Sequence, residues 1–415
     1  MLKKLTHAVC GGAMLLLVAC GAGMQAEMKI AQGNYAEAIP LYEKALQSDP
    51  DSVNHGNKLG FAYLKTNQLD QAIEQFDRIL DKDPQNSYAI LYQGMAYLNK
   101  KDFDKTLALW QNFKDDEKPV VEQEINRLMT IVMMAQNQRT ARQALQTEEK
   151  LANIDLDTST IAVVPFIDLT EDHSLQAFSK ALAAMITTDL TKINQLKVLE
   201  RGQIQALLNE MKLGQSGIVD EKTAPRIGRL LKAENVVVGN LSKGSIQTTL
   251  SLATASAGDT KGSVSAKVDV DKFYELPSLL VQNVAKIMQI QLGEAELAAI
   301  TTPHTKNFKA MVHYGSALNA LDEGNWEKAQ DFFALAIKED PIFMLARSGR
   351  DSSPGRSAPS VEAIQSADPS ENSVFLEAIE TSIKTATEAQ QAADEAAKEA
   401  STSGGGGGGG GGSSH

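Results

Sequence analysis

The chain has 415 residues and a formal net charge of −12, and 43% of its residues are hydrophobic whereas 5% are aromatic. A chain of this length accommodates two or three domains, and the low aromatic content favours helical scaffolds. The acidic balance and the absence of a basic stripe argue against nucleic acid as a partner, and they disfavour anionic membrane surfaces. The two cysteines, Cys10 and Cys20, exclude disulfides and cysteine-based metal sites once a leader that contains Cys10 is removed.

Residues 1–19 are predicted to be a secretory signal peptide. Two lysines give the chain a positive start, and an apolar run follows from Ala8 to Ala19. Such a run has the length of a secretory apolar region and is too short to span a bilayer. We therefore expect an exported protein whose leader is removed.

The leader ends in Leu17-Val18-Ala19-Cys20, which resembles the lipobox of bacterial lipoproteins. The resemblance implies cleavage before Cys20 and lipidation of its thiol. An aspartate after the cysteine usually retains such proteins in the inner membrane, whereas this chain has Gly21. The resemblance thus implies an outer-membrane lipid anchor, with the polypeptide facing the periplasm. An ordinary signal peptide with an incidental cysteine is the alternative.

A period of 34 residues runs through residues 20–150, and it resembles the tetratricopeptide repeat, a pair of antiparallel helices that buries its apolar face against neighbouring pairs. Asp49-Pro50 and Asp83-Pro84 are expected to end the second helices. The third pair departs from the pattern, because Thr106 stands in an alanine position, so its helices are expected to pack more loosely. A helix over 120–148 is expected to cap the stack. The residues predicted to pack the repeats are Ala38, Tyr42, Gly60, Tyr63, Ala72, Phe76, Gly94, Tyr97 and Trp110.

A further repeat is predicted over residues 305–347, where Ala329, Phe333 and Asp340-Pro341 keep the same order and spacing. One repeat alone is unstable, because its apolar face needs a neighbour. We expect it to dock on the N-terminal repeats, on the central domain or on another copy of the chain.

The exposed faces of the first helices are predicted to form a groove that suits an extended peptide or a partner helix. The alternative is that the repeats serve only as structure. The candidate groove residues are Asn57, Phe61, Lys65, Tyr92, Met95 and Asn99.

Residues 157–293 change to alternating strands and helices, which indicates an α/β or α+β layered domain. A buried strand is expected at 160–166, followed by a helix over 175–193. A hairpin with strands 245–255 and 262–271 comes later, and a helix over 276–292 is expected to cover its apolar side. The other expected elements are strands 197–200 and 235–239 and helices 202–212 and 222–232. The chain is therefore predicted to be an α+β multidomain protein with helical repeats on both sides of an α/β domain.

Within this region, Ile161-Ala162-Val163-Val164-Pro165-Phe166, Val198-Leu199-Glu200-Arg201 and Leu207-Leu208-Asn209-Glu210 resemble the CsgG/HfaB family of curli secretion. The resemblance implies an outer-membrane lipoprotein, and the best-known member forms a ring whose inserted hairpins make a secretion pore. The hairpin at 245–271 is long enough to span a membrane but lacks aromatic ends, which favours a soluble half-buried sheet. For Arg201, a structural ion pair is the favoured interpretation.

No catalytic or cofactor motif is present in the sequence. The six histidines are scattered without metal-ligand spacing, and no nucleophile elbow or phosphate-binding glycine loop occurs, so we expect neither an enzyme nor a metal or cofactor site. Residues 348–415 are predicted to be a low-complexity linker, an Ala-rich helix at 370–400 and a glycine tail from Gly404 to Gly412.

The predicted function is a protein-binding scaffold for assembly or export of a surface structure, with envelope or secreted proteins as partners and a lipid anchor in the membrane. The alternative is a subunit of an oligomeric secretion channel. Whether the chain forms a homo-oligomer stays open.

Overall fold

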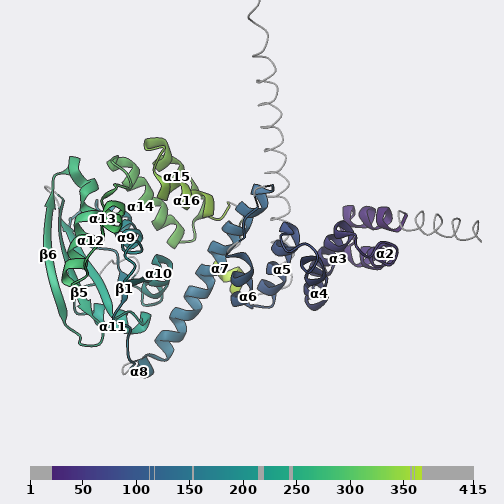
Figure 1. Cartoon of the computed structure of the whole chain (residues 1–415), viewed down its shortest axis with the longest axis horizontal. Helices are drawn as coiled ribbons and strands as arrows, with labels where there is room; N and C mark the ends of the chain where they lie inside the picture. Colours follow the sequence, from purple (N-terminus) through teal and green to yellow (C-terminus); the bar gives the residue numbers. More distant parts are fainter. Residues whose placement is uncertain are drawn as a thin grey trace, which may run out of the picture. The chain divides into compact units, whose positions relative to one another are not determined.

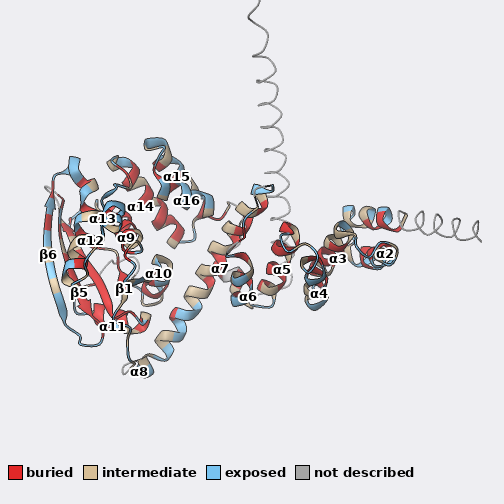
Figure 2. Ribbon diagram, viewed as in Figure 1, coloured by how far each residue is buried: buried red, intermediate tan, exposed pale blue. Residues whose placement is uncertain are grey.

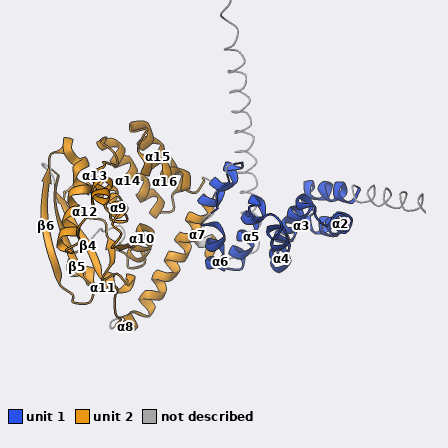
Figure 3. Ribbon diagram, viewed as in Figure 1, with its two compact units in different colours: residues 1–126, 357–359, 366–415 blue, residues 127–356, 360–365 orange. Residues whose placement is uncertain are grey.

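The structure, a computed structural model, describes residues 21–111, 113–115, 117–151, 154–213, 219–242, 246–355, 358 and 360–366. The chain divides into two compact units, coloured blue and orange in Figure 3. Unit 1 comprises residues 1–126, 357–359 and 366–415, and unit 2 comprises residues 127–356 and 360–365. The predicted signal peptide, Cys20, the Ala-rich helix at 370–400 and the glycine tail lie outside the described residues.

Unit 1 is a series of helices in which each helix from α2 to α5 packs against the next one along the chain (Figure 1). Residues 21–31 form its first described helix. α2 ends directly before Asp49-Pro50, where the sequence predicted an end. The helices that follow are α2 (Tyr35–Ser48), α3 (Val53–Lys65), α4 (Leu69–Leu80), α5 (Ser87–Asn99), α6 (Phe103–Trp110) and the beginning of α7 (Pro119–Gln146).

Two glycines set how closely the helices of a pair approach. A Cβ atom added at Gly60 would lie 2.6 Å from the ring of Phe76, and one added at Gly94 would lie 2.1 Å from Nε1 of Trp110. Both rings are buried, and the Trp110 indole donates a hydrogen bond to the carbonyl oxygen of Ile90 at 3.0 Å. Each large ring therefore fills the space that the missing side chain leaves, which explains why glycine and a ring recur 16 residues apart.

The third helix pair keeps its contacts despite the threonine. Thr106 is fully buried, and its hydroxyl donates to the carbonyl oxygens of Gly94 at 3.2 Å and of Asp102 at 3.0 Å. A buried hydroxyl with acceptors carries no large desolvation penalty. The third pair differs from the first in the length of its second helix, because α6 has 8 residues whereas α2 has 14.

Unit 2 contains a mixed sheet in the strand order β3-β1-β4-β5-β6, with β2 also paired to β4. β1 pairs in parallel with β3 and β4, and β5 pairs antiparallel with β4 and β6. Most residues of the inner strands are buried, as Figure 2 shows for β5. The strands are β1 (Thr160–Val163), β2 (Ile167–Asp168), β3 (Lys197–Val198), β4 (Asn235–Ser242), β5 (Ile246–Thr254) and β6 (Thr260–Val268).

A helix covers the hairpin as the apolar pattern predicted, but several strands are shorter than expected. β1 ends at Val163 instead of residue 166, and β3 ends at Val198 instead of residue 200. α12 packs on β5 and β6. The strand expected to reach residue 271 ends at Val268, because Lys272 N donates to Asp269 O at 2.9 Å and starts the 3-10 helix η1 (Val270–Glu275), which leaves Val270 exposed. The helices are α8 (Glu148–Leu151), α9 (Gln176–Leu190), α10 (Arg201–Glu210), α11 (Ala224–Leu231), α12 (Leu276–Ile287) and α13 (Glu294–Thr301).

The second half of α7 belongs to the central core. Ala141 is buried there beside Ile204 and Leu207 of α10, and Leu145 packs against the same cluster. The division between the units falls after Asn126, inside α7. The helix expected only to cap the repeats therefore also supplies part of the α/β core, because its apolar residues continue past the length that a cap requires.

The C-terminal helix pair, α14 (Phe308–Asp322) and α15 (Trp326–Glu339), packs on the central domain through α9. A Cβ atom added at Gly315 of α14 would lie 1.8 Å from the carbonyl oxygen of Ala177 of α9. The sequence left three possible neighbours for this helix pair: the N-terminal repeats, the central domain and another copy of the chain. The structure shows that the pair packs on the central domain. The contact buries the apolar face that a lone repeat would leave in water.

The segment after residue 347 is more ordered than its composition predicted. α16 (Met344–Ser352) continues past that point, because Ala346 is fully buried and Gly349 lies against the ring of Phe333. A short helix, α17 (Val361–Ser366), follows and buries Val361. The linker prediction is therefore wrong for residues 348–352, because the small residues Ala346 and Gly349 allow close packing that a low apolar content does not reveal.

We predict that Gly94→Ala lowers the free energy of unfolding of unit 1 by about 1–3 kcal/mol, because the new methyl group overlaps the Trp110 indole. The measurement is urea denaturation followed by Trp110 fluorescence, with Trp326 replaced by Phe. Gly21→Ala is the control, because nothing lies within 4 Å of a Cβ atom added there. Equal stability of the Gly94 and Gly21 variants would contradict the close-packing explanation.

Candidate functional site

Aromatic rings form a continuous row along unit 1, which we call the aromatic row and define as Tyr35, Phe61, Tyr92 and Tyr88. The ring centroids lie 5.9 Å apart for Tyr35 and Phe61, 4.8 Å for Phe61 and Tyr92, and 6.2 Å for Tyr92 and Tyr88. Phe61 is buried, whereas the three tyrosines are half-buried. Each tyrosine therefore keeps part of its surface available to a partner.

Two lysines lie over the rings of the aromatic row. Lys65 Nζ is 5.2 Å from the ring centroid of Tyr35, and Lys118 Nζ is 5.3 Å from that of Tyr88. A cation over a ring is held by the electrons of its face, at about 0.5–1 kcal/mol in exposed places. The row thus combines flat apolar surface with fixed positive charge.

The structure distributes the six predicted groove residues over different environments. Phe61 and Met95 are 6% and 1% exposed, so the expectation that they line an open groove is wrong. Asn57 donates to Asn86 Oδ1 at 3.0 Å, and Asn86 in turn caps α5. Lys65, Tyr92 and Asn99 are half-buried. The sequence shows which residues share a face of one helix but not how much of that face the next helix pair covers.

The residues predicted to pack the repeats occupy the interiors of their helix pairs, apart from two tyrosines. Tyr63 and Tyr97 are half-buried. The Tyr63 hydroxyl donates to Glu43 Oε1 at 2.6 Å, and burial together with this carboxylate raises the pKa of Tyr63 to about 12. The residues buried in the helix pairs are Ala38, Tyr42, Gly60, Ala72, Phe76, Gly94, Trp110, Ala329 and Phe333.

A buried charge cluster joins three helices of unit 2. Asp322, at the end of α14, lies 2.6 Å from Nζ of Lys180 on α9, and its two oxygens lie 2.7 and 2.9 Å from Nη1 of Arg201 on α10. The side chains of Lys180 and Asp322 are 9% and 7% exposed. Arg201 thus takes part in the structural ion pair expected for it, but its partner lies 121 residues away in the sequence.

The charges in this cluster are unequal, because one carboxylate faces two cations. Burial holds the pKa of Lys180 below its usual value, and repulsion from Arg201 adds to this effect while attraction to Asp322 opposes it. Burial also raises the pKa of the nearby Tyr314 to about 12. Asp322 is therefore needed to keep both cations inside the fold.

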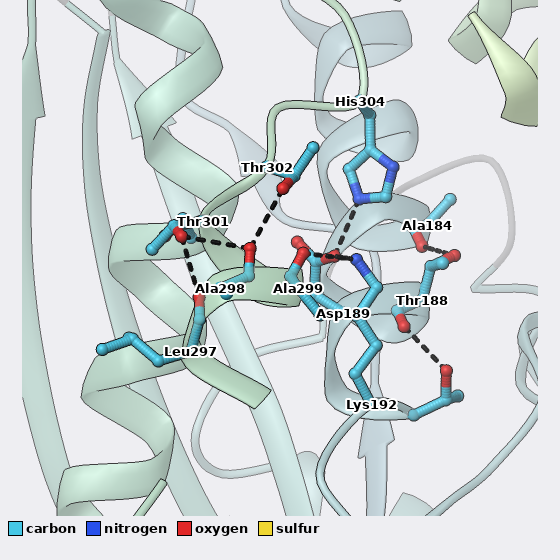
Figure 4. Close-up of polar contacts among 12 residues, drawn as sticks. Ala184, Thr188, Asp189, Lys192, Leu297, Ala298, Ala299, Thr301, Thr302 and His304 are labelled. Carbon is cyan, nitrogen blue, oxygen red and sulfur yellow. Dashed lines mark hydrogen bonds and ion pairs between the residues drawn. The ribbon is translucent and has the colours of Figure 1, made fainter. Parts of the chain in front are cut away.

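A second polar cluster ties α9 to the segment between α13 and α14 (Figure 4). Asp189 is 1% exposed, and its Oδ1 lies 2.6 Å from Lys192 Nζ and 2.9 Å from His304 Nε2. Lys192 also donates to the carbonyl oxygen of Ala299 at 3.0 Å. These contacts hold the connection that leads to the C-terminal helix pair.

The parts of the chain that the structure describes contain no group of three or more His, Cys, Asp or Glu side chains placed to hold a metal ion. None of the described helices combines the length and the apolar character needed to cross a membrane.

Sequence reasoning missed Asp322, Lys180, Tyr35 and Tyr88. The two charged residues gave no signal, because a single carboxylate or lysine on a helix is usually solvated. Tyr35 is the first residue of α2 and Tyr88 is the second residue of α5. Listing the aromatic residues near each helix start would have found both.

Two family models match this chain. The model described as tetratricopeptide repeat matches residues 29–93, and the model described as curli production assembly/transport component CsgG matches residues 138–267. The second match begins within α7, earlier than the boundary expected at residue 157, and it ends in β6. The earlier start agrees with the position of Ala141 in the central core.

The chain spans less than two thirds of the length of the curated relatives that it matches. The chain is 37% identical over 75 residues to BBSome complex member bbs-4 of Caenorhabditis elegans, which covers 18% of this chain and 16% of that protein. It is 25% identical over 91 residues to the photosystem I assembly protein Ycf3 of Prochlorococcus marinus, covering 21% and 50%. A tetratricopeptide repeat protein structure from Parabacteroides merdae aligns with a TM-score of 0.28 at 11% identity, over 80% of this chain and 99% of that one.

The fold and the family matches together define an α+β multidomain protein with a helical-repeat unit and an α/β unit. The chain carries tetratricopeptide repeats and a CsgG-family domain. The fold class and the family resemblances predicted from the sequence are thereby confirmed.

We predict that Asp322→Asn lowers the free energy of unfolding of unit 2 by about 3 kcal/mol, because it leaves Lys180 and Arg201 without a counter-charge. Trp326 fluorescence during urea denaturation measures this in a Trp110→Phe background. Adding Lys180→Met should restore part of the loss, because the double variant holds one buried cation fewer. Glu339→Gln, at an exposed position near the end of α15, is the control. Similar stabilities for the Asp322 and Glu339 variants would show that the cluster is not needed.

Proposed function

We propose that this protein is a non-enzymatic scaffold that binds envelope or secreted proteins through its repeats and supports assembly or export of a cell-surface structure. The observation that carries the proposal is the aromatic row in unit 1. Its half-buried tyrosines offer rigid aromatic surface that the side chains of a partner can contact. Tetratricopeptide repeats are consistent with protein–protein interaction, and the CsgG family supplies the link to assembly and transport.

The row favours an extended segment or an amphipathic helix as the bound element. Its rings follow one another across α2, α3 and α5, so a partner of several residues can contact each in turn. Lys118, which lies over the ring of Tyr88, adds a preference for an acidic group beside apolar ones. A single small molecule would use only a fraction of this surface.

We predict that a photo-crosslinking phenylalanine analogue at position 88 captures a defined envelope protein in cells at native abundance, because Tyr88 ends the row. The same analogue at Gln47, an exposed residue of α2 outside the row, is the control. Mass spectrometry identifies the partner. Its affinity for the purified chain should then fall by about tenfold with Tyr92→Ala. Equal capture at both positions, or no capture at position 88, would contradict the binding role.

We propose further that the protein is an outer-membrane lipoprotein whose folded part faces the periplasm. The Leu17-Val18-Ala19-Cys20 motif supports this, together with Gly21 directly after the cysteine. A lipid on Cys20 would place the first repeat next to the bilayer without any span by the polypeptide.

We predict that Cys20→Ser moves the protein from the membrane fraction to the soluble periplasmic fraction, because the acyl acceptor is lost. The measurements are cell fractionation and the mass of the amino-terminal peptide. Cys10→Ser, inside the leader, is the matched control and should leave both lipid and location unchanged. Firm membrane association of the Cys20 variant would place the anchor elsewhere.

A second candidate function is a subunit of an oligomeric secretion channel, which the CsgG family and the nine-residue lengths of β5 and β6 support. We favour the scaffold because β5 pairs with β4 along nearly its whole length and α12 packs on both β5 and β6. Releasing this hairpin would expose the buried residues of the central sheet. Ion conductance of the lipidated particle in planar bilayers would favour the channel instead.

A further inference from the structure

A pocket of about 190 Å³ lies within unit 2 between the second half of α7, the beginning of α10 and the end of α14. This space holds one side chain or a similarly small group, not a cofactor. Its lining combines methionines and a leucine with amides and with the charge cluster around Asp322. The residues that matter for recognition are Met133, Met134, Asn137, Glu200, Arg201 and Asp322.

Arg201 has one edge of its guanidinium unused in this pocket. Only Nη1 bonds Asp322, and the described part of the chain offers no partner to Nε or Nη2. Neither atom is sealed from solvent, since neither is among the buried unpaired atoms of the described residues. Nε and Nη2 form the flat fork that matches the two oxygens of a carboxylate.

Asn137 places a second free donor on the pocket wall. Its side-chain amide lacks a hydrogen-bond partner among the described residues, and its Nδ2 lies 3.2 Å from where a Cβ atom on Gly202 would be. Gly202 follows Arg201 directly, so the amide stands beside the residue that carries the guanidinium. By contrast, Gln205 and Asn209, which also line the pocket, bond each other at 2.8 Å.

We propose that this pocket binds a peptide carboxylate, either an Asp or Glu side chain or a free chain terminus of a partner protein. The carboxylate bonds Nε and Nη2 of Arg201 and accepts a further bond from Asn137. Met133 and Met134 contact the adjoining carbons, since methionine adapts its shape to varied neighbours. Asp322 does not block the site, because it bonds Nη1 on the other side of the guanidinium. Its negative charge is also balanced by Lys180.

Glu200 places a negative charge on the pocket wall, and the effect of this charge on binding can be tested. It is exposed on the pocket wall and opposes a second carboxylate, although solvent screens its charge. Recognition therefore depends on the direction of the Arg201 and Asn137 donors more than on net charge. The site lies in unit 2 and does not depend on the proposed role of the aromatic row.

The test uses the full chain labelled with ¹³C at its methionine methyl groups. The Met133 and Met134 signals are followed during addition of four probes: acetyl-Ala-Glu-Ala-amide, acetyl-Ala-Ala-Ala with a free carboxylate, acetyl-Ala-Gln-Ala-amide and inorganic phosphate. Saturable shifts with the first or the second probe assign the carboxylate to a side chain or to a chain terminus. Equal shifts with the Gln peptide, or shifts with phosphate alone, would overturn the proposal.

Variants separate the pocket from the general surface. Arg201→Lys keeps the charge beside Asp322 but removes the fork, and Asn137→Asp adds a repelling charge, so each should raise the dissociation constant by about tenfold or more. Glu200→Gln should lower it. Gln143→Glu adds the same charge as the Asn137 variant at an exposed position of α7 outside this pocket, and it should leave binding unchanged. Equal affinities for the Asn137 and Gln143 variants would overturn the assignment.

Discussion

The architecture of unit 2 depends on the contact between α14 and α9. A lone helix pair cannot bury its apolar face, and here the central domain replaces the missing neighbour. Gly315 makes this possible, because any side chain there would overlap the carbonyl oxygen of Ala177. At the end of the same helix, Asp322 bonds Lys180 and Arg201, so close backbone packing and a buried ion pair fix one helix at two points. The C-terminal helix pair thereby becomes an added part of the α/β domain.

This contact also explains why a charged residue stands at the start of α10. Arg201 follows a strand in a run that resembles the CsgG/HfaB family, and the structure shows that its partner lies on the appended helix pair. Arginine suits this place, since its charge persists when partly buried and its planar fork can serve two partners. One edge of the guanidinium stabilises the fold while the other faces the pocket. A lysine would satisfy Asp322 but offer no second edge.

The helical repeats and the approximate positions of the strands along the chain could be predicted because each depends on short-range patterns. Gly60 with Phe76 and Gly94 with Trp110 repeat at fixed spacing, and the apolar run at 161–164 can only be a buried element. Contacts between distant segments had no such signal: Asp322 looks like any helical carboxylate until α9 and α10 are placed beside it. The groove was only partly predicted, because burial of Phe61 and Met95 is decided by neighbouring helices.

The same packing rule that makes the repeats recognisable also limits where they can bind. Rings in the interior of each pair, such as Phe76 and Trp110, are buried by packing within the fold and cannot contact a partner, because they fill the space beside a glycine. Rings outside that contact are free to vary in exposure, and here Tyr35, Tyr88 and Tyr92 meet in a row with part of each surface uncovered. The proposed binding surface therefore consists of aromatic residues that the repeat pattern does not require. A sequence search for such a surface should subtract the packing positions first and then ask which remaining rings come close together in space.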